Sequence, residues 1–274
     1  MEVCAITGSK GVLGSKIRKL LPFKFYEFKG NITNFKDVND WIKRKDFKLL
    51  IHLAAKVPTG DVEKNYKKAL NTNHLGTKNI VRALILKKNR PRWVFFSSSS
   101  HVYKLSKKKI KIKESAKLSP FSKYGTTKKK AEKEILKLKK HKINYCIGRI
   151  FSFTDLNQKP PYVIPSIISK IKFSKKNVVV LRNLNHFRDF LSTNDLCKTI
   201  EKLYKTNSRG IYNIGSGEGI SLKTIALLFG SKFKKKIIFK DNKRTSYLIS
   251  NNSKILKKKI KFKKFSNNIN FLYE

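Results

Sequence analysis

Three glycines near the N-terminus constrain the fold of this chain more than any other feature. Gly8, Gly11 and Gly14 follow an apolar run at residues 3–6 and precede an amphipathic segment at residues 16–21. Between a strand and a helix, the first glycine permits a tight turn, the second lets the backbone approach a ligand, and the third allows close helix–strand packing. The helix N-terminus adds free N–H groups and the positive end of its dipole. The pattern predicts a dinucleotide-binding turn with these residues around the pyrophosphate: Gly8, Gly11, Val12, Leu13 and Gly14.

Short apolar runs alternate with longer amphipathic segments along the first 150 residues. The runs lie at residues 25–28, 49–53, 93–96 and 145–150, and the two longest helical segments span residues 63–87 and 121–141. Strands that alternate with helices favour βαβ units and a parallel sheet that is covered on both faces. We therefore expect an α/β protein with a Rossmann doubly wound parallel sheet.

The pattern changes beyond about residue 150. Prolines interrupt it between residues 160 and 165, and short strands at residues 178–181, 211–214 and 237–239 mix with short helices. This favours a dinucleotide-binding Rossmann domain at residues 1–150 and a smaller C-terminal substrate-binding lobe at residues 151–274, partly interleaved with the sheet. The lysine-rich stretch at residues 104–113 is expected to be a solvated loop or hairpin beside the site.

The charge balance is extreme, with 64 Lys and Arg residues against 17 Asp and Glu residues and a formal net charge of +47. Such a charge attracts polyanions and raises the alternative of nucleic-acid binding. However, the lysines are spread along the whole chain, and no recognition helix, zinc finger or aromatic RNA-binding motif accompanies them. We interpret the excess as compositional drift, without a specific nucleic-acid partner, and expect self-repulsion to make the stability sensitive to salt.

The cysteines indicate the compartment. Cys4, Cys146 and Cys197 are odd in number, far apart and without Cys-x-x-Cys spacing, so neither a disulfide framework nor a metal site is expected. No apolar run approaches the length that spans a bilayer, and no signal peptide fits before the first strand. We therefore expect a cytoplasmic protein with no membrane span.

A serine, a tyrosine and a lysine form the candidate catalytic group. Tyr124 and Lys128 stand four residues apart on one face of the helix that follows the fourth strand, and Ser99 lies near the end of that strand. An adjacent ammonium favours phenolate and is expected to lower the tyrosine pKa from about 10 toward neutrality. Ligands bind at the carboxyl ends of strands in such sheets, where a serine hydroxyl can hold the reacting oxygen.

These motifs together make the chain similar to the extended short-chain dehydrogenase/reductases, the NAD-dependent epimerase/dehydratase family, over nearly its whole length. Further stretches resemble the family's elements: Gly30–Thr33, His52–Ala55, Asn73–Thr77, Arg188–Phe190 and Tyr212–Ser221. The resemblance implies catalysis by Ser99, Tyr124 and Lys128 and a dinucleotide cofactor, NAD or NADP. It implies that the cofactor also contacts these residues: Asn31, Ile32, Leu53, Ala54, Ala55, Asn73, Tyr124 and Lys128.

The resemblance also places the substrate, a nucleotide-diphosphate sugar. It implies a diphosphate contact for Arg188 and further substrate contacts for Ser100, His101 and Ser152. Asn31 and Ser152 depart from the usual Asp and Asn, and Ser100-His101 replaces the acidic pair of the dehydratases, which argues against a 4,6-dehydratase. His101 is interpreted either as an acid–base group or as a loop residue that faces solvent.

The sequence therefore favours an NAD(P)-dependent nucleotide-sugar epimerase or 4-ketosugar reductase. Glu27, near the end of the second strand, is placed to bind ribose hydroxyls, whereas Lys24 and Lys29 beside it suit a 2′-phosphate. The sequence therefore does not distinguish NAD from NADP as the cofactor. A relative that acts on a non-sugar carbonyl also stays open, as does an anion- or nucleic-acid-binding protein on a degenerate scaffold. The resemblance also suggests a homodimer through the helical segments at residues 63–87 and 121–141.

Overall fold

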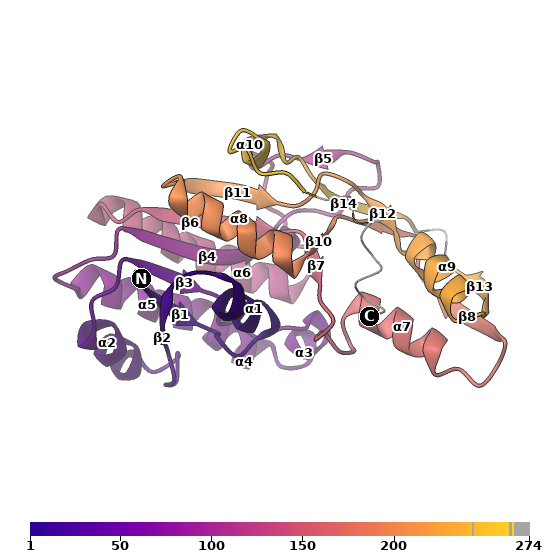
Figure 1. The fold of residues 1–274 in the computed structure, drawn as a ribbon, viewed down its shortest axis with the longest axis horizontal. Coiled ribbons are helices and arrows are strands. Elements are labelled where there is room, and N and C mark those ends of the chain that lie inside the picture. The colour runs from indigo at the N-terminus through magenta and orange to yellow at the C-terminus, as the bar shows by residue number, and fades with distance from the viewer. Residues whose placement is uncertain (243, 263–264, 266–274) are drawn as a thin grey trace.

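A six-stranded parallel sheet forms the centre of the computed structural model, which describes residues 1–242, 244–262 and 265 (Figure 1). In the strand order β11-β6-β4-β3-β1-β2, the direction in which successive strands are added reverses between β1 and β3, as in a doubly wound fold. All neighbouring pairs are parallel. The strands have these bounds: β1 (Val3–Thr7), β2 (Lys24–Glu27), β3 (Leu49–His52), β4 (Trp93–Ser99), β6 (Tyr145–Ile150) and β11 (Gly210–Ile214). The predicted Rossmann sheet is confirmed.

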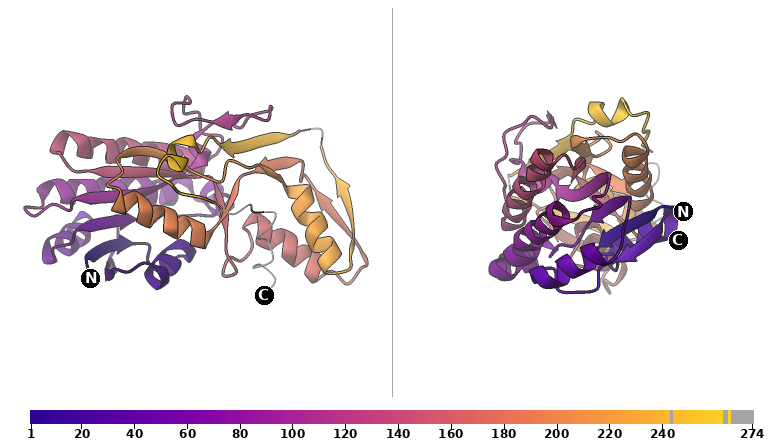
Figure 2. Two further views of the ribbon diagram at one scale, coloured as in Figure 1. Left: turned by 45° about the horizontal axis from the view of Figure 1, so that its top comes forward. Right: turned by 90° about the vertical axis from the view of Figure 1, so that its left-hand side faces the viewer.

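Helices cover both faces of this sheet because its strands are apolar on both sides (Figures 1 and 2). Along β4, Trp93 and Phe95 pack into one core and Val94 and Phe96 into the other, as the period of two in a strand requires. The first core includes α1 (Val12–Leu20) and α8 (Thr193–Lys205). The second includes α2 (Phe35–Arg44), α5 (Gly76–Leu86) and α6 (Lys123–Leu136).

The remaining elements form a smaller lobe at the carboxyl edge of the sheet, on the right in Figure 1. Its own core joins two helices to a two-stranded parallel sheet: α7 (Val163–Lys172), β8 (Val178–Arg182), α9 (Leu222–Lys232) and β13 (Lys236–Lys240). Strands β7 (Ser152–Thr154) and β10 (Phe190–Ser192) lie between this lobe and the main sheet. The chain after residue 150 also supplies β11 and α8 to the large domain.

A second small sheet links the lobe to the middle of the chain. Its order is β12-β9-β14-β5, with these bounds: β12 (Ile220–Ser221), β9 (His186–Arg188), β14 (Ser246–Ser250) and β5 (Lys111–Ile112). The short helix α10 (Ser253–Leu256) follows β14. The expectation of a solvated loop or hairpin at residues 104–113 does not include a partner from elsewhere in the chain, and it is wrong for the end of this stretch, because β5 pairs with β14. The partner is more than 130 residues away in the sequence, and no local pattern predicts it.

The long helix expected at residues 63–87 is also wrong in detail. The structure divides it into α3 (Thr59–Lys64), α4 (Tyr66–Leu70), a π-helical turn (Asn71–Leu75) and α5. The predicted helix at 121–141 is α6 followed by a 3-10 turn (Lys137–His141). All three cysteines are buried and free. Within the described ranges, the search for a helix with the length and hydropathy to cross a bilayer finds none.

Candidate active site

The glycine turn connects β1 to α1 as predicted. Gly8 has a φ of +71°, and a Cβ there would lie 2.7 Å from the Ala54 backbone nitrogen. A Cβ at Gly14 would lie 2.2 Å from the Gly8 carbonyl oxygen. Gly11 is different, because its Cβ would meet only the Gly8 oxygen at 3.4 Å and its φ is −71°. The fold itself therefore requires glycine at positions 8 and 14, whereas at Gly11 the open side of the turn remains for a ligand.

The N-terminus of α1 fits a phosphate. Gly11 is its N-cap and provides no side chain, and the first turn contains no acidic residue. The first N–H groups of the helix, including those of Val12 and Leu13, therefore have no side-chain acceptor, and the positive end of the dipole is uncompensated. These features match a dinucleotide pyrophosphate.

The end of β2 carries a charged carboxylate beside this turn. Glu27 pairs with Arg18 at 2.6 Å, and the Ser9 hydroxyl and the Arg18 guanidinium lower the Glu27 pKa. Asn31 caps the next turn, because its Oδ1 accepts hydrogen bonds from the Thr33 backbone and hydroxyl. Ile32 is buried below it.

A hydrogen-bonded chain fixes the end of β3, where Leu53, Ala54 and Ala55 are half-buried. Thr7 Oγ1 accepts from the Ala54 N–H at 3.2 Å and contacts His52 Nδ1 at 2.7 Å. His52 Nε2 contacts Thr77 Oγ1 at 2.9 Å, and that hydroxyl donates to a carbonyl. Because the Thr77 hydroxyl donates its own hydrogen elsewhere, it accepts from His52, so the imidazole proton is on Nε2. Burial and the nearby Lys128 charge lower the pKa of His52 to about 3. His52 is a neutral, buried residue that joins strands to helix.

The π-helical turn places Asn73 in the same region. Its Oδ1 accepts from the Lys56 N–H at 2.7 Å, and its Nδ2 donates to Thr127 Oγ1 at 2.9 Å. Asn73 thus ties the loop after β3 to the residue that precedes Lys128. A π-turn inside a helix is often found at a functional site.

Close packing of α6 against the end of β4 brings the candidate catalytic residues together. A Cβ at Gly125 would lie 2.1 Å from the His101 carbonyl oxygen, so only glycine allows this approach. The Tyr124 ring lies edge-on to the His101 ring, 5.6 Å between centroids, and the Ser99 hydroxyl interacts with the Tyr124 phenol. Lys128 Nζ lies 6.0 Å from the Tyr124 ring centroid and donates to the Ser97 carbonyl at 2.7 Å. The three residues Ser99, Tyr124 and Lys128 therefore converge at the carboxyl edge of the sheet.

The pKa of Tyr124 does not follow the expectation. Burial raises it, with a further rise from Tyr162 of the smaller lobe, and the Ser99 hydroxyl lowers it only in part. Burial also lowers the pKa of Lys128 to about 7, against an opposing effect of Glu132. The phenol is consequently protonated at neutral pH, because burial disfavours the charged phenolate.

Arg188 and His101 face each other between the large domain and the lobe. Burial and the Arg188 charge lower the pKa of His101 to about 4, and its Nδ1 lies 3.1 Å from Ser122 Oγ. Arg188 donates to the Phe187 and Ser246 carbonyls and to Ser246 Oγ. Within the described ranges, no carboxylate lies within ion-pair distance of Arg188. Among those residues, this half-buried guanidinium lacks a counter-charge.

The other two predicted substrate residues are placed differently. Ser100 is fully buried, and its hydroxyl donates to the Phe151 carbonyl at 3.4 Å, so it exposes no surface to a substrate in this structure. Ser152 is half-buried in β7, where its backbone N–H donates to the Asp189 carbonyl.

Sequence reasoning missed several residues that shape the site. Asp189 is fully buried, and its carboxylate accepts hydrogen bonds from Ser216, Gly217 and Ser250. It thereby fixes the segment that carries Arg188. Glu132 and Arg149 form a buried ion pair beneath Lys128. The i, i+4 spacing of Lys128 and Glu132 is a usable signal for the glutamate, whereas the pairing with Arg149 depends on the fold.

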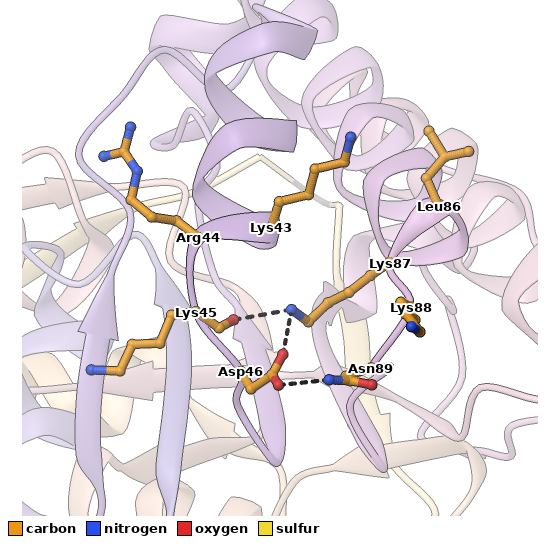
Figure 3. Close-up of a pocket in the computed structure, with 8 residues that line it drawn as sticks. All are labelled: Lys43, Arg44, Lys45, Asp46, Leu86, Lys87, Lys88 and Asn89. Atoms are coloured by element: carbon orange, nitrogen blue, oxygen red, sulfur yellow. Dashed lines mark hydrogen bonds and ion pairs between the residues drawn. The ribbon is translucent and has the colours of Figure 1, made fainter.

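A basic cavity at the C-terminal ends of α2 and α5 is a poor candidate site (Figure 3). Lys87 is already bound to the Lys45 carbonyl at 3.1 Å and to Asp46 at 2.8 Å. The side chains of Lys43, Arg44 and Lys45 point in different directions in Figure 3. Cations at helix C-termini complement the dipole, which accounts for them without a ligand. In the part of the chain that the structure describes, no three His, Cys, Asp or Glu side chains are grouped so that they could hold a metal ion.

Comparisons with known proteins identify the family and the fold. The family profile described as GDP-mannose 4,6 dehydratase matches residues 6–270. The GDP-6-deoxy-D-talose 4-dehydrogenase of Aggregatibacter actinomycetemcomitans is 26% identical over 231 residues, 80% of this chain and 76% of the relative.

Two solved structures share the fold. The dTDP-4-dehydrorhamnose reductase of Bacillus anthracis in complex with NADP has a TM-score of 0.84 at 19% identity, with 100% of this chain and 99% of the other covered. The UDP-glucose 4-epimerase of Thermus thermophilus in complex with NAD has a TM-score of 0.82 at 16% identity, with 95% and 94% covered. With the profile match over almost the whole chain, these findings show that the chain belongs to the GDP-mannose 4,6 dehydratase family of extended short-chain dehydrogenases/reductases.

Proposed function

We propose that the protein is an NAD(P)-dependent enzyme that transfers hydride to or from a sugar carbon of a nucleotide-diphosphate sugar, as a 4-ketosugar reductase or an epimerase. The observation that carries this proposal is the convergence of Ser99, Tyr124 and Lys128 at the carboxyl edge of the sheet that also carries the glycine turn. A nicotinamide dinucleotide bound there would supply or accept the hydride. Gly8, Gly11 and Gly14 would hold its pyrophosphate, and the residues at the ends of β1 and β3 would line its remaining part.

The side chains would then manage the proton on the reacting oxygen. Tyr124 is protonated, so it donates its proton to the oxygen of a carbonyl as that carbon is reduced. Ser99 orients the same oxygen, and Lys128 stabilises the phenolate that remains. Reduction is the direction that a protonated phenol favours, and an epimerase would use the same step in both directions.

Arg188 supports a substrate that carries a diphosphate. Its half-buried guanidinium has no carboxylate partner among the described residues and faces His101 across the two domains. A planar guanidinium binds phosphate oxygens with two parallel hydrogen bonds. We propose that residues 1–150 hold the cofactor, that residues 151–274 hold the nucleotide part of the substrate, and that the sugar lies near His101 and Ser152.

We propose NAD rather than NADP as the preferred cofactor. Glu27 is ionised at the end of β2 and is linked to the glycine turn through Ser9. A carboxylate there accepts hydrogen bonds from the ribose hydroxyls and repels a 2′-phosphate. The positive charge of Arg18 is already neutralised by Glu27. The dissociation constant of NADH should be lower than that of NADPH, and Glu27→Ala should reverse the order. Tighter NADPH binding by the unaltered protein would contradict the proposal.

We also propose a homodimer and a cytoplasmic location. Large apolar side chains are exposed on the helices suggested for the interface, Leu86 on α5 and Leu136 on α6. Light scattering on the purified protein measures the dimer directly. All three thiols are unpaired, as a reducing compartment favours.

The test of the function is an assay of the purified protein against a panel of nucleotide sugars and their 4-keto derivatives. Nicotinamide absorbance and product stereochemistry are followed together, because a reductase consumes NADH in each cycle and an epimerase does not. Tyr124→Phe should abolish turnover while NADH binding survives. Unchanged turnover would refute the role of Tyr124.

Two outcomes would point to the competing functions. Turnover of a simple ketone but of no nucleotide sugar would identify an enzyme of another carbonyl class. A steep log–log salt dependence of DNA binding without any turnover would favour a nucleic-acid-binding protein on this scaffold.

A further inference from the structure

A buried ionic network lies directly beneath Lys128. Glu132 follows Lys128 by four residues on α6, so both side chains lie on the same face of the helix. Lys128, Glu132 and Arg149 are 2%, 2% and 3% exposed, respectively. Charged side chains are almost never this buried unless they are paired, and the arrangement of the three charges therefore requires an explanation.

The carboxylate of Glu132 is fixed from two sides. Arg149 Nη2 donates to Oε2 at 2.8 Å and Nε donates to Oε1 at 3.0 Å, which makes a bidentate pair. The Ser98 hydroxyl donates to Oε1 at 2.5 Å. The neighbouring residue on β4, Ser97, accepts the hydrogen bond from Lys128 Nζ. One strand end therefore holds both the ammonium and the carboxylate.

Arg149 is itself fully engaged. Its Nη1 donates to Tyr103 Oη at 2.8 Å and to the Glu114 carbonyl at 3.0 Å, and Tyr103 Oη donates to Asn213 Oδ1 at 2.7 Å. The guanidinium cannot rotate away without breaking these bonds. Glu132 is consequently held in one position relative to Lys128.

Glu132 offsets part of the positive charge in this region. Lys128 and Arg149 are two buried cations, and Glu132 is the anion that lies with them. The other titratable groups that face Lys128 provide no negative charge. His52 on β3 is neutral, Tyr124 on α6 is protonated, and Tyr103 is a phenol whose pKa burial raises to about 12. Tyr162 of the smaller lobe faces Tyr124 and is also a neutral phenol.

We propose that Glu132 is a positioning residue for the catalytic step: a carboxylate clamped by Arg149 and Ser98 that keeps the Lys128 ammonium charged inside the protein. This inference rests on the proposed function, because it assumes that charged Lys128 assists Tyr124. Burial lowers the pKa of Lys128 to about 7 against the opposing attraction of Glu132. Without the carboxylate, the pKa of Lys128 should fall further, and the side chain would be mostly uncharged at neutral pH.

The test compares Glu132→Gln with a matched control on the same helix, Glu134→Gln. Glu134 is also paired, with Lys137 and His74, but it does not contribute to the shifted pKa of Lys128. Protein labelled with ¹³C and ¹⁵N in its lysines is titrated by NMR, and the Lys128 resonance is identified by its loss in Lys128→Met. Glu132→Gln should lower the Lys128 pKa by about one pH unit or more, since an opposite charge at close range shifts a pKa by roughly that amount. Glu134→Gln should leave it unchanged.

Activity provides the second readout. In Glu132→Gln, the alkaline limb of the kcat/KM profile should move to lower pH by the same amount as the NMR titration, and Glu132→Asp should restore part of the shift. If Glu132→Gln does not fold, Glu132→Gln combined with Arg149→Gln removes both charges and avoids an unpaired buried cation. In that double variant the Lys128 pKa should still lie below that of the unaltered protein. A Lys128 titration that coincides with the unaltered protein in either variant would overturn the inference.

The two proposals fail separately. The NMR titration needs no substrate, so it tests the action of Glu132 on Lys128 even if the enzyme acts on another compound. Failure of Lys128→Met and Tyr124→Phe to reduce turnover would instead refute the proposed function and leave the NMR result intact.

Discussion

Two glycines of the same turn should respond in opposite ways to the same substitution. At Gly11, the added Cβ of alanine would meet a single atom at 3.4 Å, an ordinary contact. At Gly14, it would lie 2.2 Å from the Gly8 oxygen and 2.8 Å from the Ser9 Cα, and both atoms belong to the backbone. Gly11→Ala should therefore impair cofactor binding and spare the fold, whereas Gly14→Ala should impair the fold.

The magnitudes follow from these contacts. For Gly11→Ala, the loss of a favourable N-cap residue, roughly 0.5–1 kcal/mol, is offset by a similar gain from a less flexible unfolded chain. The melting temperature should then change by no more than about 3 °C. Overpacking against backbone at Gly14 should cost about 3 kcal/mol or more, which lowers the melting temperature by roughly 6–12 °C in a protein of this size. The Cβ at position 11 would occupy the space of the pyrophosphate and should weaken NADH binding about tenfold or more.

Thermal melts and fluorescence titration with NADH measure the two effects on the same preparations. Gly60→Ala is the matched control, because a Cβ there has no atom within 4 Å, and it should change neither quantity adversely. The reasoning would be refuted if Gly11→Ala bound NADH like the unaltered protein. It would also be refuted if Gly11→Ala melted as low as Gly14→Ala.

Three further predictions concern substrate, pH and salt. Arg188→Leu should raise KM for the nucleotide sugar and weaken binding of a nucleoside diphosphate without changing NADH affinity. Arg188→Lys should recover only part of the lost affinity, because an ammonium cannot make the bidentate contact. Equal KM values in the unaltered protein and both variants would contradict this role of Arg188. The His52 pKa is about 3 in the folded protein and about 6.5 in the unfolded chain. The contribution of neutral His52 to the free energy of unfolding is therefore complete above pH 6.5 and is lost progressively as the pH falls toward 3. The total loss is on the order of 3–5 kcal/mol. The free energy of unfolding, measured with urea between pH 7 and pH 4, should thus depend less on pH in His52→Gln than in the unaltered protein. An equal pH dependence in the two proteins would contradict this prediction. With a formal charge of +47, the melting temperature should rise by several degrees between low salt and about 0.5 M NaCl, and no change would exclude self-repulsion as a determinant of stability.

The sequence predicts the parts of the fold that depend on local chemistry. Gly8 and Gly14 are required by the turn itself, so the order strand, turn and helix could be predicted from their spacing. Tyr124 and Lys128 are one helical turn apart, so their common face follows from helix geometry. The alternation of apolar runs likewise predicts the parallel sheet, because each strand must be apolar on both sides.

The remaining features depend on contacts between distant segments. The π-turn at Asn71–Leu75 contains no glycine or proline, and it is stabilised by the hydrogen bonds of Asn73 to Lys56 and Thr127. The sequence predicts a lowered Tyr124 pKa because it shows the neighbouring lysine and not the degree of burial, which has the larger effect. The pair of Glu132 and Arg149 joins a helix to a strand, and only the packed structure brings these two residues together.

The position of β14 has a consequence for the synthesis of the protein. Arg188 is held by Ser246, and β5 is paired with β14, so the substrate side of the site needs residues that the ribosome adds 58 or more positions after Arg188. The glycine turn, β3 and α6 come from the first half of the chain. The helix α8, which packs with α1 in one core, and the strand β11 follow before β14. During synthesis, the elements around the glycine turn would therefore be complete before the residues that hold Arg188, so the two sides of the site would form in the order of the chain.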